Sequence, residues 1–176
     1  MSLEKGYVQV YTGNGKGKTT AALGQALRSA GGGLKTLIVQ FMKDSPSGET
    51  KSIKQLHKRV RLEQYGNDLF VLNKQPPSDM DLDAAHEGLN RSQQAMLSGE
   101  YDIVIMDEVC VAIHFGLLKI EQLLPLLDKR PRSVEVILTG RYCPQELIEK
   151  ADLVTEMREV KHYYQKGIPA RKGIES

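Results

Sequence analysis

The sequence predicts an α/β fold in which helices cover both faces of a mainly parallel sheet. Strand-like and helix-like segments alternate from one end of the chain to the other. A glycine-rich loop follows the first strand, and the most apolar strand ends in acidic residues. Because strands joined through helices pair in parallel, this alternation favours a parallel sheet between two helical layers.

Short β-prone runs mark the strands. The first two cover 7–11 and 37–41, and an alternating run at 60–64 predicts a third. The most apolar strand is 101–108. Further strands are predicted at 133–139 and 153–157.

Helical segments separate these strands. Residues 19–29 are rich in Ala, Leu and Gln, and three glycines at 31–33 end that helix. The segments that follow are a polar loop at 43–48, a basic helix to about 58, a long loop at 65–78, and helices at 79–97, 120–127 and 144–150. The polar tail, about 160–176, is predicted to be irregular.

Length and composition limit the class of protein. At 176 residues, one domain spanning 1–176 is expected. A net charge of +2 is too small to indicate nucleic acid or an anionic membrane surface as a partner. Cys110 and Cys143 lack CxxC spacing and fit a reducing compartment. Neither a signal peptide nor a run of roughly 20 apolar residues is found, so the expected location is the cytoplasm.

A loop rich in glycine and lysine, residues 12–20, lies between the first strand and the first helix. The usual phosphate-binding pattern is Gly, four residues, Gly-Lys and Ser or Thr, and here Thr12 stands where its first glycine is expected. Glycines let backbone N–H groups turn toward phosphate oxygens, and the following helix adds its positive dipole end. The loop therefore predicts ATP binding, and not a plain surface turn. Its binding residues are Gly13, Asn14, Gly15, Lys16, Gly17, Lys18, Thr19 and Thr20.

Asp107 and Glu108 end the most apolar strand, at the edge where open α/β sheets bind ligands. Beside a phosphate-binding loop, Thr19, Asp107 and Glu108 are predicted to hold Mg²⁺ (or Mn²⁺), and Lys18 and Glu108 to be catalytic. Two alternatives stay open: the acidic pair caps a helix that begins near Val109, or Glu108 is the base of an ATPase. Loop and acidic strand end together make the predicted fold P-loop NTPase-like (RecA-like).

Several strings along the chain resemble one known family. They are GNGKGKTTAALG at 13–24, IVQF at 38–41, GEYD at 99–102, Asp107-Glu108, LTGR at 138–141, ADLVTEMR at 151–158, Lys161-His162 and GIE at 173–175. In this order and spacing they resemble the P-loop type of ATP:corrinoid adenosyltransferase, which acts in adenosylcobalamin biosynthesis or salvage.

The resemblance implies group transfer and not hydrolysis. In that family the cobalt(I) of a corrinoid attacks the 5′ carbon of ATP, which lies reversed in its loop, and triphosphate leaves. By position, 13–20 would bind triphosphate, Thr19 and Glu108 would serve magnesium, and Arg141 would steady phosphate or substrate. A surface salt bridge explains Arg141 equally well. The family also suggests a homodimer and a flavoprotein or flavin as the reductant.

The chain departs from the family in the loop after the third strand. The family carries a motif close to Gly-Glu-Gly-Phe-Thr-Trp there, whose aromatic side chains approach the corrin ring. The equivalent stretch here is GNDLFV at 66–71, and the chain has no tryptophan. Leu69 and Phe70 are therefore predicted to be the apolar contacts to the corrinoid.

Two other functions stay open, an ATP-hydrolysing protein and a non-catalytic module that senses ATP or corrinoid through the loop at 65–78. The histidines offer no metal-ligand spacing; they are His57, His86, His114 and His162. Cys110 is expected to be a buried apolar residue and not a nucleophile.

Overall fold

A six-stranded sheet forms the centre of the computed structural model, which describes residues 3–44, 47–56, 58–73 and 75–174. His57 and Glu175, both considered above, lie outside these residues. The strand order is β3-β2-β4-β5-β1-β6, and every pairing is parallel. The strands are β1 Val8–Thr12, β2 Thr36–Phe41, β3 Val60–Tyr65, β4 Ile103–Asp107, β5 Glu135–Thr139 and β6 Leu153–Glu156. The predicted parallel α/β fold is confirmed, with strand ends shifted by at most about two residues.

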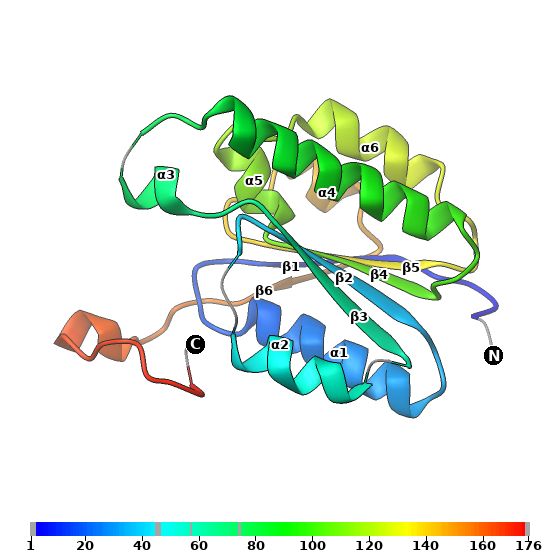
Figure 1. Ribbon diagram of the computed structural model, residues 1–176, viewed down its shortest axis with the longest axis horizontal. Helices are drawn as coiled ribbons and strands as arrows, with labels where there is room; N and C mark the ends of the chain where they lie inside the picture. Colours follow the sequence, from blue (N-terminus) through cyan, green and yellow to red (C-terminus); the bar gives the residue numbers. More distant parts are fainter. Residues whose placement is uncertain (1–2, 45–46, 57, 74, 175–176) are drawn as a thin grey trace.

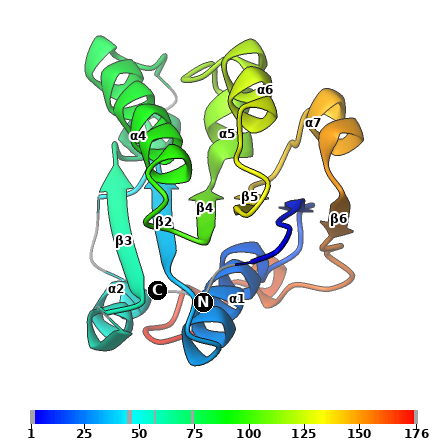
Figure 2. The same cartoon turned by 90° about the vertical axis from the view of Figure 1, so that its right-hand side faces the viewer.

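Helices cover both faces of the sheet (Figures 1 and 2). One layer holds α4 Asp79–Leu97, α5 Val109–His114, α6 Ile120–Asp128 and α7 Gln145–Lys150. The other holds α1 Lys18–Gly31 and α2 Gly48–Ile53, which continues into the 3-10 turn η1 Lys54–Leu56. No helix of the described residues is long and apolar enough to cross a membrane.

Side chains alternate along the central strands between these two layers. Ile38, Ile105 and Ile137 pack in the cluster that contains Ala22 and Ala26 of α1. Their neighbours in sequence, such as Val39, Met106 and Leu138, pack in the larger cluster beneath the other helical layer. Because both faces are buried, these strands are continuously apolar, which is the pattern of a parallel sheet.

The predicted loop at 65–78 contains a short helix, α3 Leu69–Leu72, that the sequence did not predict. Phe70 is 6% exposed, and its ring meets that of Phe115 edge-on, with centroids 5.8 Å apart. This single buried aromatic side chain fixes the turn, so tertiary packing and not local helix propensity explains α3. The loop ends where Ser78 caps α4: its hydroxyl accepts from the amide of Asp81.

All six strands end at one edge of the sheet, on the left in Figure 1. The glycine-rich loop leaves β1 there, and β5 separates β1 from β4, the strand that carries Asp107. The tail beyond β6 runs along the same side and contains the 3-10 turn η2 Tyr163–Lys166, with the rest irregular as predicted. The topology thus brings three distant parts of the chain to one edge.

Candidate active site

The glycine-rich loop is shaped by close contact with the chain beyond β6. Gly13 and Gly17 have φ angles of +94° and +120°, which L side chains rarely adopt. A Cβ atom on Gly13 or Gly15 would lie 2.5 or 2.7 Å from the carbonyl oxygen of Met157. The Gly15 amide donates to that same oxygen at 2.6 Å. The glycines are therefore needed both for the turn and for the approach of Met157.

The loop leads directly into the first turn of α1. Gly17 is the N-cap of this 14-residue helix and offers no side chain to cap it. Backbone N–H groups in a first helical turn have no partner within the helix, and they attract anions. The junction of loop and helix is thus suited to phosphate oxygens.

Lys18 is buried inside the loop, with 7% of the residue exposed. Its Nζ donates to the carbonyl oxygens of Gly13 and Gly15, both at 2.8 Å. Burial lowers the pKa of Lys18, although the nearby carboxylate of Glu108 opposes that effect. The ammonium group is held in place by two backbone carbonyl oxygens, so it is positioned to attract an anion in the loop.

Asp107 is the centre of a buried hydrogen-bond network at the end of β4. Its Oδ1 accepts from the hydroxyls of Thr19 at 2.9 Å and Thr139 at 2.6 Å, and its Oδ2 accepts from Gln40 Nε2 at 3.0 Å. Gln64 supports Gln40 through a further bond of 3.0 Å. The network joins α1 to the ends of β2, β4 and β5. It brings Thr19 and Asp107 into direct contact.

Glu108 lies next to this network in the left-handed conformation, with φ +63°. Its amide donates to Thr139 Oγ1 at 3.0 Å. Its side chain makes no capping bond to α5, so helix capping does not account for it. Burial, and secondly the charge of Asp107, raise its pKa to about 7, against the opposing effects of Lys18 and Arg141. A carboxyl group with this pKa is poised to exchange a proton near neutral pH.

A cavity of about 890 Å³ lies over the loop, within the size range of small-molecule sites. Glu108, predicted to be catalytic and to bind metal, lines it. So do most of the predicted nucleotide-binding residues: Gly15, Lys16, Gly17, Lys18, Thr19, Thr20 and Arg141. The remaining walls come from α1, the loop after β2, α2 and the tail, and include Leu23, Lys43, Glu49, Ser52, His162 and Ile174. Gly13 and Asn14 belong to the loop but do not line the cavity.

The tail closes one side of this cavity. Lys16 Nζ donates to the carbonyl oxygen of Ile174 at 2.8 Å, and His162 accepts the amide of Tyr164 at 3.1 Å through Nδ1. Nothing in the residue pattern predicts this return of the chain.

The sequence analysis also did not predict that Gln40 and Thr139 belong to the site. The available signal was a polar residue near the carboxyl end of an apolar strand.

The two predicted corrinoid contacts lie apart from the cavity. Phe70 is buried against Phe115, so little of its ring faces solvent, whereas Leu69 is 55% exposed. In this structure Phe70 anchors α3 and Leu69 is open to solvent; their contact with the corrinoid stays a prediction.

The other titratable groups form no metal site of the usual kind. Within the described ranges, no three His, Cys, Asp or Glu side chains are grouped to hold a metal ion. Cys110 is fully buried, and its contact with Cys143, together with burial, raises the pKa of its thiol. Its expected role as a buried apolar residue is consistent with both observations.

Comparison with known proteins identifies the family to which this chain is similar. A sequence model of the family described as ATP:corrinoid adenosyltransferase BtuR/CobO/CobP matches residues 4–176. The corrinoid adenosyltransferase of Escherichia coli K12 is 35% identical over 173 residues, which cover 98% of this chain and 86% of that protein. Corrinoid adenosyltransferase CobA of Salmonella typhimurium LT2 is 34% identical, with coverage of 98% and 86%. The corrinoid adenosyltransferase of Pseudomonas aeruginosa PAO1 is also 34% identical, with coverage of 98% and 84%.

Proposed function

The chain belongs to the ATP:corrinoid adenosyltransferase family, and on that premise we propose that it transfers the 5′-deoxyadenosyl group of ATP to the cobalt of a corrinoid. The cobalt(I) substrate supplies an electron pair and forms the new cobalt–carbon bond. The bond between C5′ and oxygen breaks, and its electron pair leaves with triphosphate. The reaction contributes to adenosylcobalamin biosynthesis or salvage.

One observation carries this proposal: Lys18 is buried and pre-positioned in a glycine-rich loop within the cavity that Glu108 and Arg141 also line. Because cobalt(I) is a strong nucleophile, the protein need only orient C5′ and stabilise the leaving group. Lys18, the loop amides and Lys16 stabilise the negative charge that develops on triphosphate. Arg141, which lines the same cavity, steadies phosphate or substrate.

The donor atoms at the end of β4 fit a magnesium ion. The Thr19 hydroxyl and the carboxylates of Asp107 and Glu108 are oxygen ligands, which Mg²⁺ or Mn²⁺ prefers. We assign Thr19 and Glu108 to direct contact. Asp107, whose oxygens already accept three hydrogen bonds, orients Thr19 from behind. The ion, when bound, would neutralise part of the phosphate charge.

Four further proposals extend this function. We propose that the chain acts as one domain and as a homodimer in the cytoplasm. We also propose that a flavoprotein or reduced flavin generates cobalt(I). The basic stretch at 51–61 is the candidate surface for that donor, because Lys51, Lys54 and Arg61 are exposed on it.

ATP hydrolysis is the second candidate function, and one observation favours it. A carboxyl group with a pKa of about 7, such as Glu108, is suited to orient or deprotonate a water molecule. An ATP- or corrinoid-sensing module without transfer is the third.

Product analysis separates the three functions. The protein is incubated with ATP, Mg²⁺ and chemically reduced cobalamin, and the products are resolved chromatographically. Adenosyl transfer predicts triphosphate and a light-sensitive alkylcobalamin in equal amounts. ADP and phosphate formed without corrinoid would replace transfer with hydrolysis, and corrinoid binding with intact ATP would leave only a sensor.

A further inference from the structure

An exposed aromatic pair is joined through the backbone to two residues, Glu108 and Arg141, that line the active-site cavity. Tyr142 is 52% exposed and stacks on His114, with ring centroids 4.1 Å apart and an interplanar angle of 24°. Tyrosine and histidine rings stacked in this way at the surface present a flat, largely apolar face. Neither residue has a role in the loop, the cavity or the Asp107 network described above.

The pair is tied to two functional residues through the backbone. Tyr142 directly follows Arg141, which lines the cavity. His114 ends α5, the helix that begins immediately after Glu108. Because a helix of six residues rises roughly 9 Å, the backbone of His114 lies about that far along the helix axis from its start beside Glu108. Any acceptor that approaches the nucleotide from this side meets both rings.

The turn that precedes Tyr142 packs closely against α5. Gly140 has φ +140°, and a Cβ atom there would lie 2.9 Å from Cys110 Cβ and 3.0 Å from the Val111 amide nitrogen. The turn that carries Tyr142 is thus pressed against α5, which carries His114. This packing helps to fix the position of the Tyr142 ring relative to the His114 ring.

The aromatic contacts continue from the pair to the loop at 65–78. His114 meets Phe115 edge-on at 5.2 Å, and Phe115 meets Phe70 at 5.8 Å. Phe70 anchors α3, whose Leu69 and Leu72 are exposed. Stacked rings and apolar side chains therefore lie along one continuous part of the carboxyl edge.

Tyr142 also has an unfavourable backbone conformation, with φ +59° in the left-handed region that favours glycine. Strained residues of this kind are found at ligand sites, where the side chain is needed despite the strain. A tyrosine with half its surface in solvent contributes little to the core. A contact between the Tyr142 side chain and a bound ligand would explain why tyrosine stands at this strained position.

We propose that Tyr142 and His114 form a platform that contacts the corrin macrocycle of the acceptor and so determine its affinity. This rests on the proposed adenosyl transfer. The corrin ring is broad, flat and largely apolar, and it matches a rigid aromatic surface in shape and chemistry. In a chain without tryptophan, this platform supplies the aromatic contact that Phe70, being buried, does not.

Kinetics of Tyr142→Gly test the platform. Glycine removes the ring and suits the left-handed backbone, so the variant is expected to fold with an unchanged or higher Tm. We expect its KM for cobalamin to rise about 10-fold, while its KM for ATP stays within about two-fold of wild type. Tyr142→Phe keeps the ring and should restore the wild-type KM, and His114→Ala should raise it by a smaller factor.

Tyr7→Ala is the matched control, because Tyr7 is 42% exposed at the opposite, amino edge of the sheet. A cobalamin KM unchanged in Tyr142→Gly would overturn the proposal, as would an equal rise in the KM for ATP. Equilibrium dialysis of cobalamin against each variant in saturating ATP gives the same comparison without turnover. If wild type binds cobalamin but makes no alkylcobalamin, the proposed function fails while the dialysis still decides the platform.

Discussion

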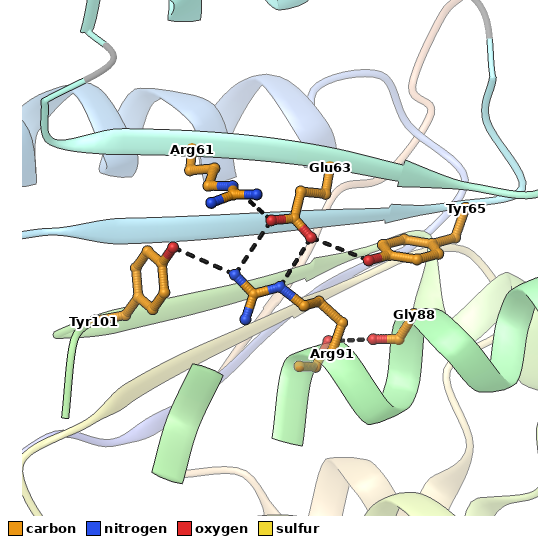
Figure 3. Close-up of polar contacts among 7 residues, drawn as sticks. Arg61, Glu63, Tyr65, Gly88, Arg91 and Tyr101 are labelled. Atoms are coloured by element: carbon orange, nitrogen blue, oxygen red, sulfur yellow. Dashed lines mark hydrogen bonds and ion pairs between the residues drawn. The ribbon is translucent and has the colours of Figure 1, made fainter. Parts of the chain in front are cut away.

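Two groups of charged side chains in this protein differ in how their charges are partnered. At the end of β4, Lys18 bonds to backbone carbonyl oxygens, and Asp107 accepts from hydroxyl and amide groups. On β3, Glu63 is paired with two arginines (Figure 3). The first group holds its charges among neutral partners, whereas the second neutralises them within the chain.

The β3 group is a closed network. Arg91 of α4 donates to both carboxylate oxygens of Glu63, from Nε to Oε2 at 2.9 Å and from Nη2 to Oε1 at 3.2 Å. Arg61 Nε lies 2.6 Å from Oε1 of the same carboxylate. The Tyr65 hydroxyl donates to Glu63, and Tyr101 accepts from Arg91. Burial raises the pKa of Glu63, but its bonds with Arg91 and Tyr65 outweigh that effect and lower it. Burial and the Glu63 carboxylate raise the pKa of Tyr65 to about 12.

The difference separates a structural cluster from a binding site. Charges that neutralise one another hold α4 on the sheet and have little attraction left for a ligand. Charges held by neutral groups keep most of their field for a ligand of opposite sign. We therefore expect substitutions at the end of β4 to affect turnover and those on β3 to affect stability.

Lys18→Ala should have the largest effect. The substitution removes the buried ammonium group that would stabilise the negative charge of the leaving triphosphate. We expect kcat/KM to fall about 1000-fold, which corresponds to about 4 kcal/mol of lost transition-state stabilisation. Triphosphate release measures it. Lys150→Ala, which breaks the surface pair with Asp128, is the control and should retain full activity. Normal turnover by Lys18→Ala would remove the glycine-rich loop from the site.

Asp107→Asn should rank second. The amide keeps the shape of the side chain but loses the charge that orients the Thr19 hydroxyl, so we expect about a 100-fold loss of kcat and a higher Mg²⁺ requirement. A magnesium titration of triphosphate release provides the measurement. Asp102→Asn, near the opposite end of the same strand, is the control; equal losses in both variants would count against a role specific to Asp107.

Glu108→Gln should change how stability depends on pH. In the folded protein the pKa of Glu108 is raised from 4.5 to about 7, so the folded state binds more protons than the unfolded state between these values. Wild-type stability should therefore fall as pH rises through this window, relative to Glu108→Gln, by about 2 kcal/mol. Urea unfolding at pH 4.5 and 8, without metal or nucleotide, checks this. A constant difference between the two proteins would show that Glu108 titrates normally.

Glu63→Gln should have the smallest effect and leave turnover unchanged. Because the folded-state pKa of Glu63 is lowered, its charge stabilises the fold above the unfolded pKa, and this contribution is lost as pH falls through the folded pKa. We expect the substitution to destabilise the fold by about 1 kcal/mol at pH 7, and this difference to disappear below the folded-state pKa of Glu63. Denaturant unfolding measures the stability. A large loss of kcat without loss of stability would contradict the distinction between the two groups.

The sequence was sufficient to predict the sheet and the centre of the site. The alternation of segments predicted the strands. The residue pattern of the loop marked Lys18 and Thr19 as candidate site residues, because phosphate binding requires a local pattern of glycine and lysine. Asp107 and Glu108 were recognisable for a similar reason, since they end an apolar strand.

Contacts between distant segments were not predictable in the same way. The burial of Phe70 depends on Phe115, and the position of Ile174 over Lys16 depends on a tail without regular structure. The bond between Glu63 and Arg91 joins an edge strand to a helix, and each residue alone is typical of a solvated surface. The periodicity of a sequence does not indicate which distant side chains contact each other.

Binding of inorganic triphosphate tests the central claim most directly, because it needs neither reduced corrinoid nor turnover. Calorimetric titration of the wild type, Lys18→Ala and Glu63→Gln with magnesium triphosphate compares the two groups of charges in one measurement. The account predicts one site per chain in wild type, similar affinity in Glu63→Gln and at least about a 10-fold loss in Lys18→Ala, or about 1.4 kcal/mol. Equal affinity in wild type and Lys18→Ala would contradict it.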